Sequence, residues 1–84
     1  MGKINAKIFS LETGFEDLEK LKSIRIKSKT YNLLIMEDYL PIIGEVEGNV
    51  TFVSEDKEET LSDINAYYRH SHNEFELLIK DKND

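Results

Sequence analysis

Apolar and polar residues alternate in two segments near the start of the chain. Residues 3–11 alternate loosely, and residues 23–28 alternate cleanly, with Ile24 and Ile26 on one side and charged side chains on the other. A period of two is typical of a strand that buries one face. We therefore predict a first strand at 3–11 and a second at 23–28.

The spacing changes between these two segments. Phe15, Leu18 and Leu21 follow one another at intervals of three, and Thr13 precedes Glu16 with the spacing of a capping box. That combination is typical of the start of a helix. The pattern predicts a short helical segment here, too short to be stable alone.

The middle of the chain predicts three more strands. Residues 33–36 are apolar on both faces, which is typical of a central strand of a packed sheet. Residues 42–47 and 50–54 alternate on either side of Gly48-Asn49, a pair that tolerates the positive φ of a tight turn. We predict a hairpin that turns at this pair.

The last third of the chain fits two structures. One helix over residues 61–79 would align several apolar residues, whereas residues 64–68 and 75–79 alternate as two strands with a turn near 71–73. A run of weak helix formers favours the hairpin. We predict a mainly β fold, a small two-sheet sandwich with at most short helical turns. An α+β fold with a C-terminal helix is the alternative.

Length and composition limit the domain organisation. The 84 residues, 39% of them hydrophobic, suffice for one core, so we predict a single domain over 1–84 with a disordered charged tail at 80–84. The absence of cysteine excludes disulfides, thiolate zinc sites and a cysteine nucleophile. No signal segment and no membrane-spanning run is present in the sequence, so we expect a cytoplasmic protein without direct membrane insertion.

The charge is negative and unevenly distributed. A net charge of −6 argues against non-specific binding of nucleic acid, and we expect no nucleic-acid partner. Residues 20–29 are nevertheless basic, with aliphatic rather than aromatic residues interleaved, which favours a solvated strand face. The acid-rich residues 55–59 suggest a further alternative, an acidic inhibitor from a mobile element. The basic stretch argues against it.

His70, His72 and Glu74 form the cluster most like a binding site. Residues two apart on a strand share a face, so two imidazoles and a carboxylate could bind a metal such as zinc. No third histidine completes a tetrahedral set, and solvated histidines at a polar turn are the favoured interpretation. A small metal- or ligand-binding protein that uses this cluster remains an alternative function.

Four carboxylates offer the only candidate acid/base pair: Glu37, Asp38, Glu45 and Glu47. Two close carboxylates can push their pKa values apart, but nothing in the sequence places these residues in a pocket. We predict no catalytic residues and no cofactor. The chain is expected not to be an enzyme.

The whole chain resembles the N-terminal β-sandwich domain of the F-type ATP synthase epsilon subunit. The segments that carry the resemblance are 10–12, 21–26, 33–36, 40–43, 48–53 and 74–79. The family usually has a glycine-rich turn and a histidine-alanine-proline tripeptide where this chain has Asp38-Tyr39-Leu40-Pro41, and it usually continues into a helical hairpin after the sandwich. The resemblance implies a sandwich without chemistry of its own, which docks on a partner subunit.

The predicted function is a non-enzymatic protein–protein interaction module. Its partner would be another protein of unknown identity, bound in the epsilon-like manner or otherwise. Its interaction residues would lie in the loop that the single proline closes: Glu37, Asp38, Tyr39, Leu40 and Pro41. Tyr67 and Tyr68 would face opposite sides of a strand, and the exposed tyrosine is suited to a protein contact.

Overall fold

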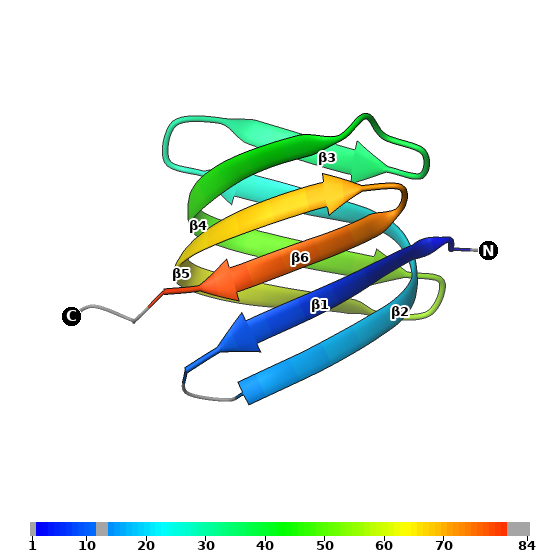
Figure 1. Ribbon diagram of the computed structural model, residues 1–84, viewed down its shortest axis with the longest axis horizontal. Coiled ribbons are helices and arrows are strands. Elements are labelled where there is room, and N and C mark those ends of the chain that lie inside the picture. The colour runs from blue at the N-terminus through cyan, green and yellow to red at the C-terminus, as the bar shows by residue number, and fades with distance from the viewer. Residues whose placement is uncertain (1, 12–13, 81–84) are drawn as a thin grey trace.

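The computed structural model describes residues 2–11 and 14–80, and all of their regular secondary structure is extended. The strands in chain order are β1 (Ile4–Ser10), β2 (Gly14–Ser28), β3 (Asn32–Met36), β4 (Ile42–Ser54), β5 (Glu58–Ser71) and β6 (Glu74–Ile79) (Figure 1). The predicted mainly β class is confirmed. No helix among the described residues is long and apolar enough to cross a membrane.

The strands form one sheet that closes on itself. The order is β1-β6-β5-β4-β2-β3, and β1 also pairs with β2, which closes five of the strands into a barrel. Strand β1 is parallel to β6 and antiparallel to β2. Figure 1 shows the strands curling around a common interior. The predicted sandwich of two sheets is wrong at this level, because β1 pairs with both β6 and β2 and so closes a single sheet.

The core lies inside the barrel and follows the alternation of the strands. Phe75 on β6 lies at its centre, with its ring centroid 6.0 Å from that of Phe52 and 5.8 Å from that of Tyr68. Aromatic pairs at such distances stabilise a core beyond the area they bury. The remaining buried apolar residues are Ile4, Ala6, Ile8, Leu21, Ile24, Ile26, Ile35, Val46, Val50, Ile64, Ala66 and Leu77.

The segment predicted as a short helix is the first half of β2. Between Leu18 and Leu21 the ladder with β1 advances three residues on β2 for two on β1, and Lys20 has a positive φ of 60°. This bulge inserts one extra residue, so inward-facing positions lie three apart rather than two. The helix-like spacing of Phe15, Leu18 and Leu21 therefore combines the outward-facing Phe15 with two inward-facing residues on either side of the bulge. Thr13, the predicted cap, lies outside the described residues.

Strand β4 is continuous where the sequence predicts a hairpin. It passes through Gly48 and Asn49 without turning and pairs with β5 along almost its whole length. A Cβ at Gly48 would collide with the carbonyl oxygen of Lys27, so glycine here permits close approach of β2 rather than a reversal. The irregularity in the ladder lies opposite, on β5, where Asp63 has a φ of 55°.

Strand β3 forms, but it is not central. It pairs only with β2 and ends the strand order, although Ile35 is buried in the barrel. Leu34 and Met36, on the opposite face, are 42% and 50% exposed. The run is therefore apolar on both faces for a different reason from the predicted one: its inner face is in the core, and its outer face consists of exposed apolar residues.

The C-terminal hairpin is confirmed. Strands β5 and β6 pair antiparallel, and His72 and Asn73 between them both have positive φ. Two residues of this conformation are the preferred connection of a twisted hairpin. The alternative with a C-terminal helix is wrong, and the strands predicted at 3–11 and 23–28 correspond to β1 and the second half of β2.

Candidate functional site

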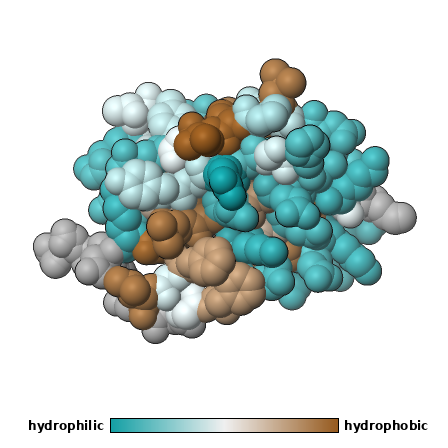
Figure 2. Space-filling view, in the orientation of Figure 1, coloured by the Kyte–Doolittle hydropathy of each residue, from teal (hydrophilic) through white to brown (hydrophobic). Residues whose placement is uncertain are grey.

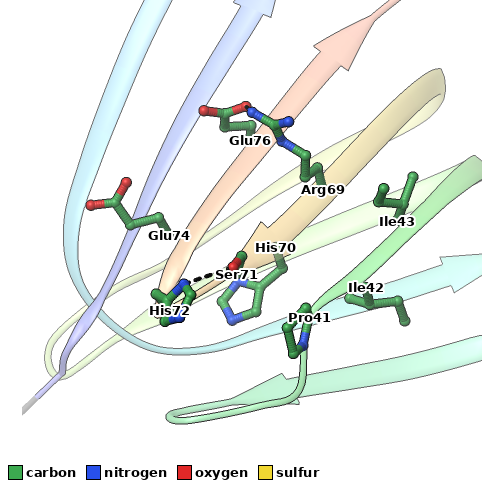
Figure 3. Close-up of a pocket in the computed structure, with 9 residues that line it drawn as sticks. All are labelled: Pro41, Ile42, Ile43, Arg69, His70, Ser71, His72, Glu74 and Glu76. Atoms are coloured by element: carbon green, nitrogen blue, oxygen red, sulfur yellow. Dashed lines mark hydrogen bonds and ion pairs between the residues drawn. The ribbon is translucent and has the colours of Figure 1, made fainter.

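The three residues of the predicted metal cluster are not brought together. His70 faces the barrel interior and is fully buried, whereas His72 lies exposed in the turn and its Nδ1 is 2.8 Å from the hydroxyl of Ser71. Figure 3 shows Glu74 pointing away from the ring of His70. The positive φ of His72 breaks the alternation that would have placed both imidazoles on one face. No group of three potential metal ligands occurs in residues 2–11 and 14–80.

Apart from Tyr68, His70 is the only buried residue with an ionisable side chain among the described residues. Neither of its ring nitrogens has a hydrogen-bond partner among the described residues, and its ring centroid lies 6.2 Å from that of Phe75. Burial in these apolar surroundings lowers the pKa of His70 below its usual value. His70 is therefore a core residue, and we expect its burial to make the fold less stable in acid.

The predicted interaction loop is tied to the opposite hairpin. The backbone N–H of Asp38 donates to the side-chain oxygen of Asn73 at 2.7 Å, and the amide of Asn73 donates back to the carboxylate of Asp38 at 3.1 Å. The carboxylate of Glu37 accepts from the backbone N–H of Lys3 at 3.2 Å. These acids thus have structural partners within the chain. Tyr39 packs against the core, so the loop's apolar exposure comes from Leu40, which is 77% exposed.

A shallow concavity of about 490 Å³ lies between this loop and the β5–β6 turn. Pro41, Ile42 and Ile43 line one side, and residues from β5 and β6 line the other (Figure 3). Arg69 and Glu76 form an ion pair at 2.9 Å on the side formed by β5 and β6. The polar groups at its surface are therefore largely paired with one another.

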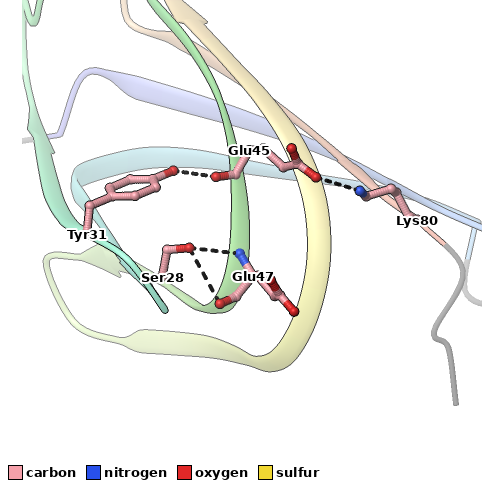
Figure 4. Close-up of polar contacts among 5 residues, drawn as sticks. All are labelled: Ser28, Tyr31, Glu45, Glu47 and Lys80. Atoms are coloured by element: carbon pink, nitrogen blue, oxygen red, sulfur yellow. Dashed lines mark hydrogen bonds and ion pairs between the residues drawn. The ribbon is translucent and has the colours of Figure 1, made fainter.

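The other two candidate carboxylates face outward and pair with lysines. The carboxylate of Glu45 lies 2.7 Å from the ammonium of Lys80, and that of Glu47 lies 3.2 Å from that of Lys29. Figure 4 shows both glutamates on the outer side of β4, where the carbonyl of Glu45 accepts from the hydroxyl of Tyr31 and the backbone N–H of Glu47 donates to the hydroxyl of Ser28. Each carboxylate neutralises a cation, and the pair predicted for acid/base chemistry is not assembled.

The register aligns four exposed apolar side chains across the outside of the barrel. Phe15 on β2 is opposite Phe9 on β1, Phe9 is opposite Leu78 on β6, and Leu78 is opposite Tyr67 on β5. Their exposed fractions lie between 42% and 54%. We call these residues the apolar row. Figure 2 shows apolar side chains gathered on this face, over the ends of β1 and β6 and the start of β2.

Contacts within the apolar row hold its side chains in place. The rings of Phe9 and Phe15 are tilted with centroids 5.0 Å apart, and the ammonium of Lys80 lies 4.4 Å from the ring centre of Tyr67. The hydrogen bond to Glu45 raises the pKa of Lys80 and keeps it charged over the ring. Tyr67 and Tyr68 face opposite sides of β5, as the sequence predicts.

A row of charged residues borders the apolar row on the same face, two residues further along each strand. Lys7 on β1 is opposite Glu76 on β6, which is opposite Arg69 on β5 and forms its ion pair. A groove of about 400 Å³ extends between the two rows to Ile43, which is 78% exposed. An apolar centre with a polar border is the usual composition of a protein interface.

The sequence predicted that one of Tyr67 and Tyr68 would be an exposed contact residue, but it did not indicate Phe9, Phe15 or Leu78. The outward positions of β1 and β6 carried the signal: Phe9 and Leu78 stand in phase with charged residues rather than with the core residues. An apolar residue out of phase with a strand's buried face is a surface residue. Only the register between strands reveals that these residues are neighbours.

Comparison with known proteins identifies the fold but not the family. The sequence matches no protein-family model and no curated protein. The structure is similar to a chain of the central stalk/c-ring portion of the Tetrahymena thermophila mitochondrial ATP synthase, with a TM-score of 0.70, 13% identity and 94% of this chain covered. This chain spans 64% of the length of that one. At this identity the likeness shows the fold alone.

The predicted resemblance to the epsilon subunit is wrong. The similar solved chain is described by its place in the central stalk and c-ring, not as an epsilon subunit. The sheet closes into a barrel, whereas the resemblance implied a two-sheet sandwich. The comparisons therefore give this chain a mainly β fold that also occurs in a rotary ATP synthase, and no family.

Proposed function

We propose that this chain is a non-enzymatic interaction module that docks on another protein through the apolar row. The observation that carries the proposal is the alignment of Phe9, Phe15, Leu78 and Tyr67 on four adjacent strands. Single exposed apolar residues are common on protein surfaces, but a contiguous group with large aromatic members marks a contact site.

The occupant we propose is a folded protein surface. Aromatic and leucine side chains in the centre, with ion pairs such as Arg69–Glu76 at the border, match the anatomy of protein interfaces. The net charge of −6 disfavours a nucleic acid. The structural neighbour is part of a multi-protein complex, which supports a protein partner without identifying it. We expect this contact to be made in the cytoplasm.

Capture from a lysate of the native host, with three proteins compared side by side, tests the proposal. Wild type, the row variant Tyr67→Ser/Leu78→Ser and the loop variant Leu40→Ser would each be immobilised, and bound proteins quantified. Interface residues of this kind often contribute 2 kcal/mol or more to binding. We therefore expect the row variant to lose a specific partner by at least about tenfold and Leu40→Ser to retain it.

The matched variants separate this proposal from the loop that the sequence favoured. Leu40 is an exposed apolar residue outside the row, so Leu40→Ser controls for non-specific hydrophobic binding. Loss of the partner in Leu40→Ser with retention in the row variant would assign docking to residues 37–41 instead. Circular dichroism of each variant verifies that the barrel is intact.

A further inference from the structure

Strand β3 has one edge without a ladder partner in the described part of the chain. The backbone N–H of Ser28 donates to the carbonyl of Tyr31 at 2.8 Å, which fixes the phase of the antiparallel β2–β3 ladder. Hydrogen-bonded pairs alternate in such a ladder, so Leu33 and Ile35 bond to β2. The N–H and C=O of Leu34 then point away from β2.

This edge has few of the usual protections of edge strands. Natural sheets protect free edges with short strands, lysine, proline, bulges or a covering segment, and β3 is short, at five residues. The sequence of β3, Asn-Leu-Leu-Ile-Met, contains no charge and no proline, and its ladder with β2 has no irregularity. Leu34 and Met36 are 42% and 50% exposed on its outer face. Closure of the barrel leaves this as the open end of the sheet.

Two unpaired cations stand beside the edge. Arg25 is opposite Leu34, and Lys27 is opposite Asn32, on the outer face of β2. Their partners on β4 are Thr51 and Asn49, so no carboxylate lies directly opposite either cation. None of the ion pairs among residues 2–11 and 14–80 includes Arg25 or Lys27. This is a local basic face on a protein of net charge −6.

We propose that the free edge of β3 binds an extended acidic segment of a partner protein by strand addition. The segment would add its backbone hydrogen bonds at Leu34, about 4.8 Å away. The carboxylates on the outer face of the segment would lie roughly two strand spacings from Arg25 and Lys27 on β2. An extended arginine or lysine side chain and a glutamate side chain can together bridge that distance. The alternate positions of the segment would face inward beside Leu33 and Ile35, and we expect them to be apolar.

This site is distinct from the apolar row. The row lies over β2, β1, β6 and β5 near Phe9, whereas the edge lies beside the second half of β2, on β3. One surface presents side chains to a folded partner, and the other presents backbone groups to an unfolded segment. The two proposals can therefore fail separately.

Selection of displayed eight-residue peptides against the immobilised full chain tests the proposal. We expect enrichment of proline-free sequences that alternate acidic residues with β-branched or aromatic residues. The best peptide, resynthesised with a fluorophore, would be titrated by anisotropy. We expect affinity to fall at least about tenfold for Leu34→Pro and at least about fivefold for Arg25→Glu/Lys27→Glu.

Leu34→Pro is informative because it removes a donor that β2 does not use, so the edge strand should tolerate it. Leu34→Thr keeps the donor and is the matched control, which we expect to bind within about threefold of wild type. The row variant Tyr67→Ser/Leu78→Ser should bind the peptide as wild type does. Amide exchange at Leu34 should slow when the peptide is bound.

Four results would overturn the proposal. They are no enrichment of any peptide, enrichment of basic sequences, equal affinity in Leu34→Pro, and loss of affinity in the row variant alone. A fifth result would also overturn it: sedimentation velocity could show a dimer of the free protein that dissociates in the Leu34→Pro variant. The occupant of the edge would then be a second copy of this chain.

Discussion

The two faces of the β5–β6 hairpin differ sharply although the same two strands form both. The inward face carries Tyr68, His70 and Phe75, stacked around the centre of the barrel, and the outward face carries Tyr67 and Leu78 of the apolar row. Alternation in a strand thus separates stability from recognition by a single residue step. Substitutions on the two faces should consequently affect different measurements.

The largest expected effect is on the inward face. Phe75→Ala removes the ring that contacts Phe52, Tyr68 and His70, and it should lower the free energy of unfolding by about 3–5 kcal/mol. Urea denaturation measures this directly. The outward Leu78→Ala, on the same strand, should change the free energy of unfolding by no more than about 0.5–1 kcal/mol. Similar losses for both variants would mean that the faces are not energetically distinct.

The next effect is a loss of stability in acid. The pKa of His70 is lowered in the folded protein, so below its ordinary value of 6.5 the unfolded chain binds a proton that the folded chain does not. The stabilisation is complete above pH 6.5 and decreases as the pH falls from there to the folded-state pKa. Each pH unit in this window should cost up to about 1.4 kcal/mol, measured by urea denaturation between pH 7.5 and 5.

Two variants show whether His70 causes this dependence. His70→Leu replaces an unpaired buried polar group with an apolar one of similar size, so it should flatten the profile without loss of stability at pH 7. His72→Asn, at an exposed turn position with positive φ, should retain the wild-type slope. An unchanged slope in His70→Leu would assign the acid sensitivity to other groups.

A smaller effect is expected where β5 meets the β2–β3 turn. The hydroxyl of Tyr31 lies 2.9 Å from that of the buried Tyr68 and donates to the carbonyl of Glu45 at 2.5 Å (Figure 4). Burial and this contact hold the pKa of Tyr68 well above its usual range. Tyr31→Phe leaves the Tyr68 hydroxyl without its partner and should cost about 1–2 kcal/mol. In a Tyr68→Phe background the same change should cost less, which a double-mutant cycle measures.

The smallest effect is expected outside the barrel, at the Arg69–Glu76 pair. Both side chains are substantially solvent-exposed, so their coupling in a double-alanine cycle should be about 0.2–1 kcal/mol. At 1 M salt the coupling should largely disappear. A coupling that persists in high salt would show that this pair belongs energetically with the inward face.

The parts of the fold that could be predicted from the sequence are those with an undisturbed period of two. Strand β1 and the β5–β6 hairpin are of this kind. The first half of β2 was misread because the bulge at Lys20 converts the period to three. The continuity of β4 was missed because Gly48 has the composition of a turn but serves the close approach of Lys27.

The site was less predictable than the strands. Burial of His70 follows from its phase with Ala66 and Tyr68, yet its separation from His72 depends on the backbone of the turn. The apolar row depends on register between β1 and β6, which are far apart in sequence. Closure into a barrel depends on the same pairing. A single sequence carries no direct record of which distant strands are neighbours.

The parallel pairing of β1 with β6 has a consequence for synthesis on the ribosome. Strand β1 leaves the exit tunnel well before β6, since the register joins Asn5 to Glu74 and Ser10 to Ile79. Contacts so distant along the chain form late, because a long loop must close first. The edge of β1 that pairs with β6 therefore stays exposed in the nascent chain until β6 has been synthesised. During this interval the chain would benefit most from binding by a chaperone.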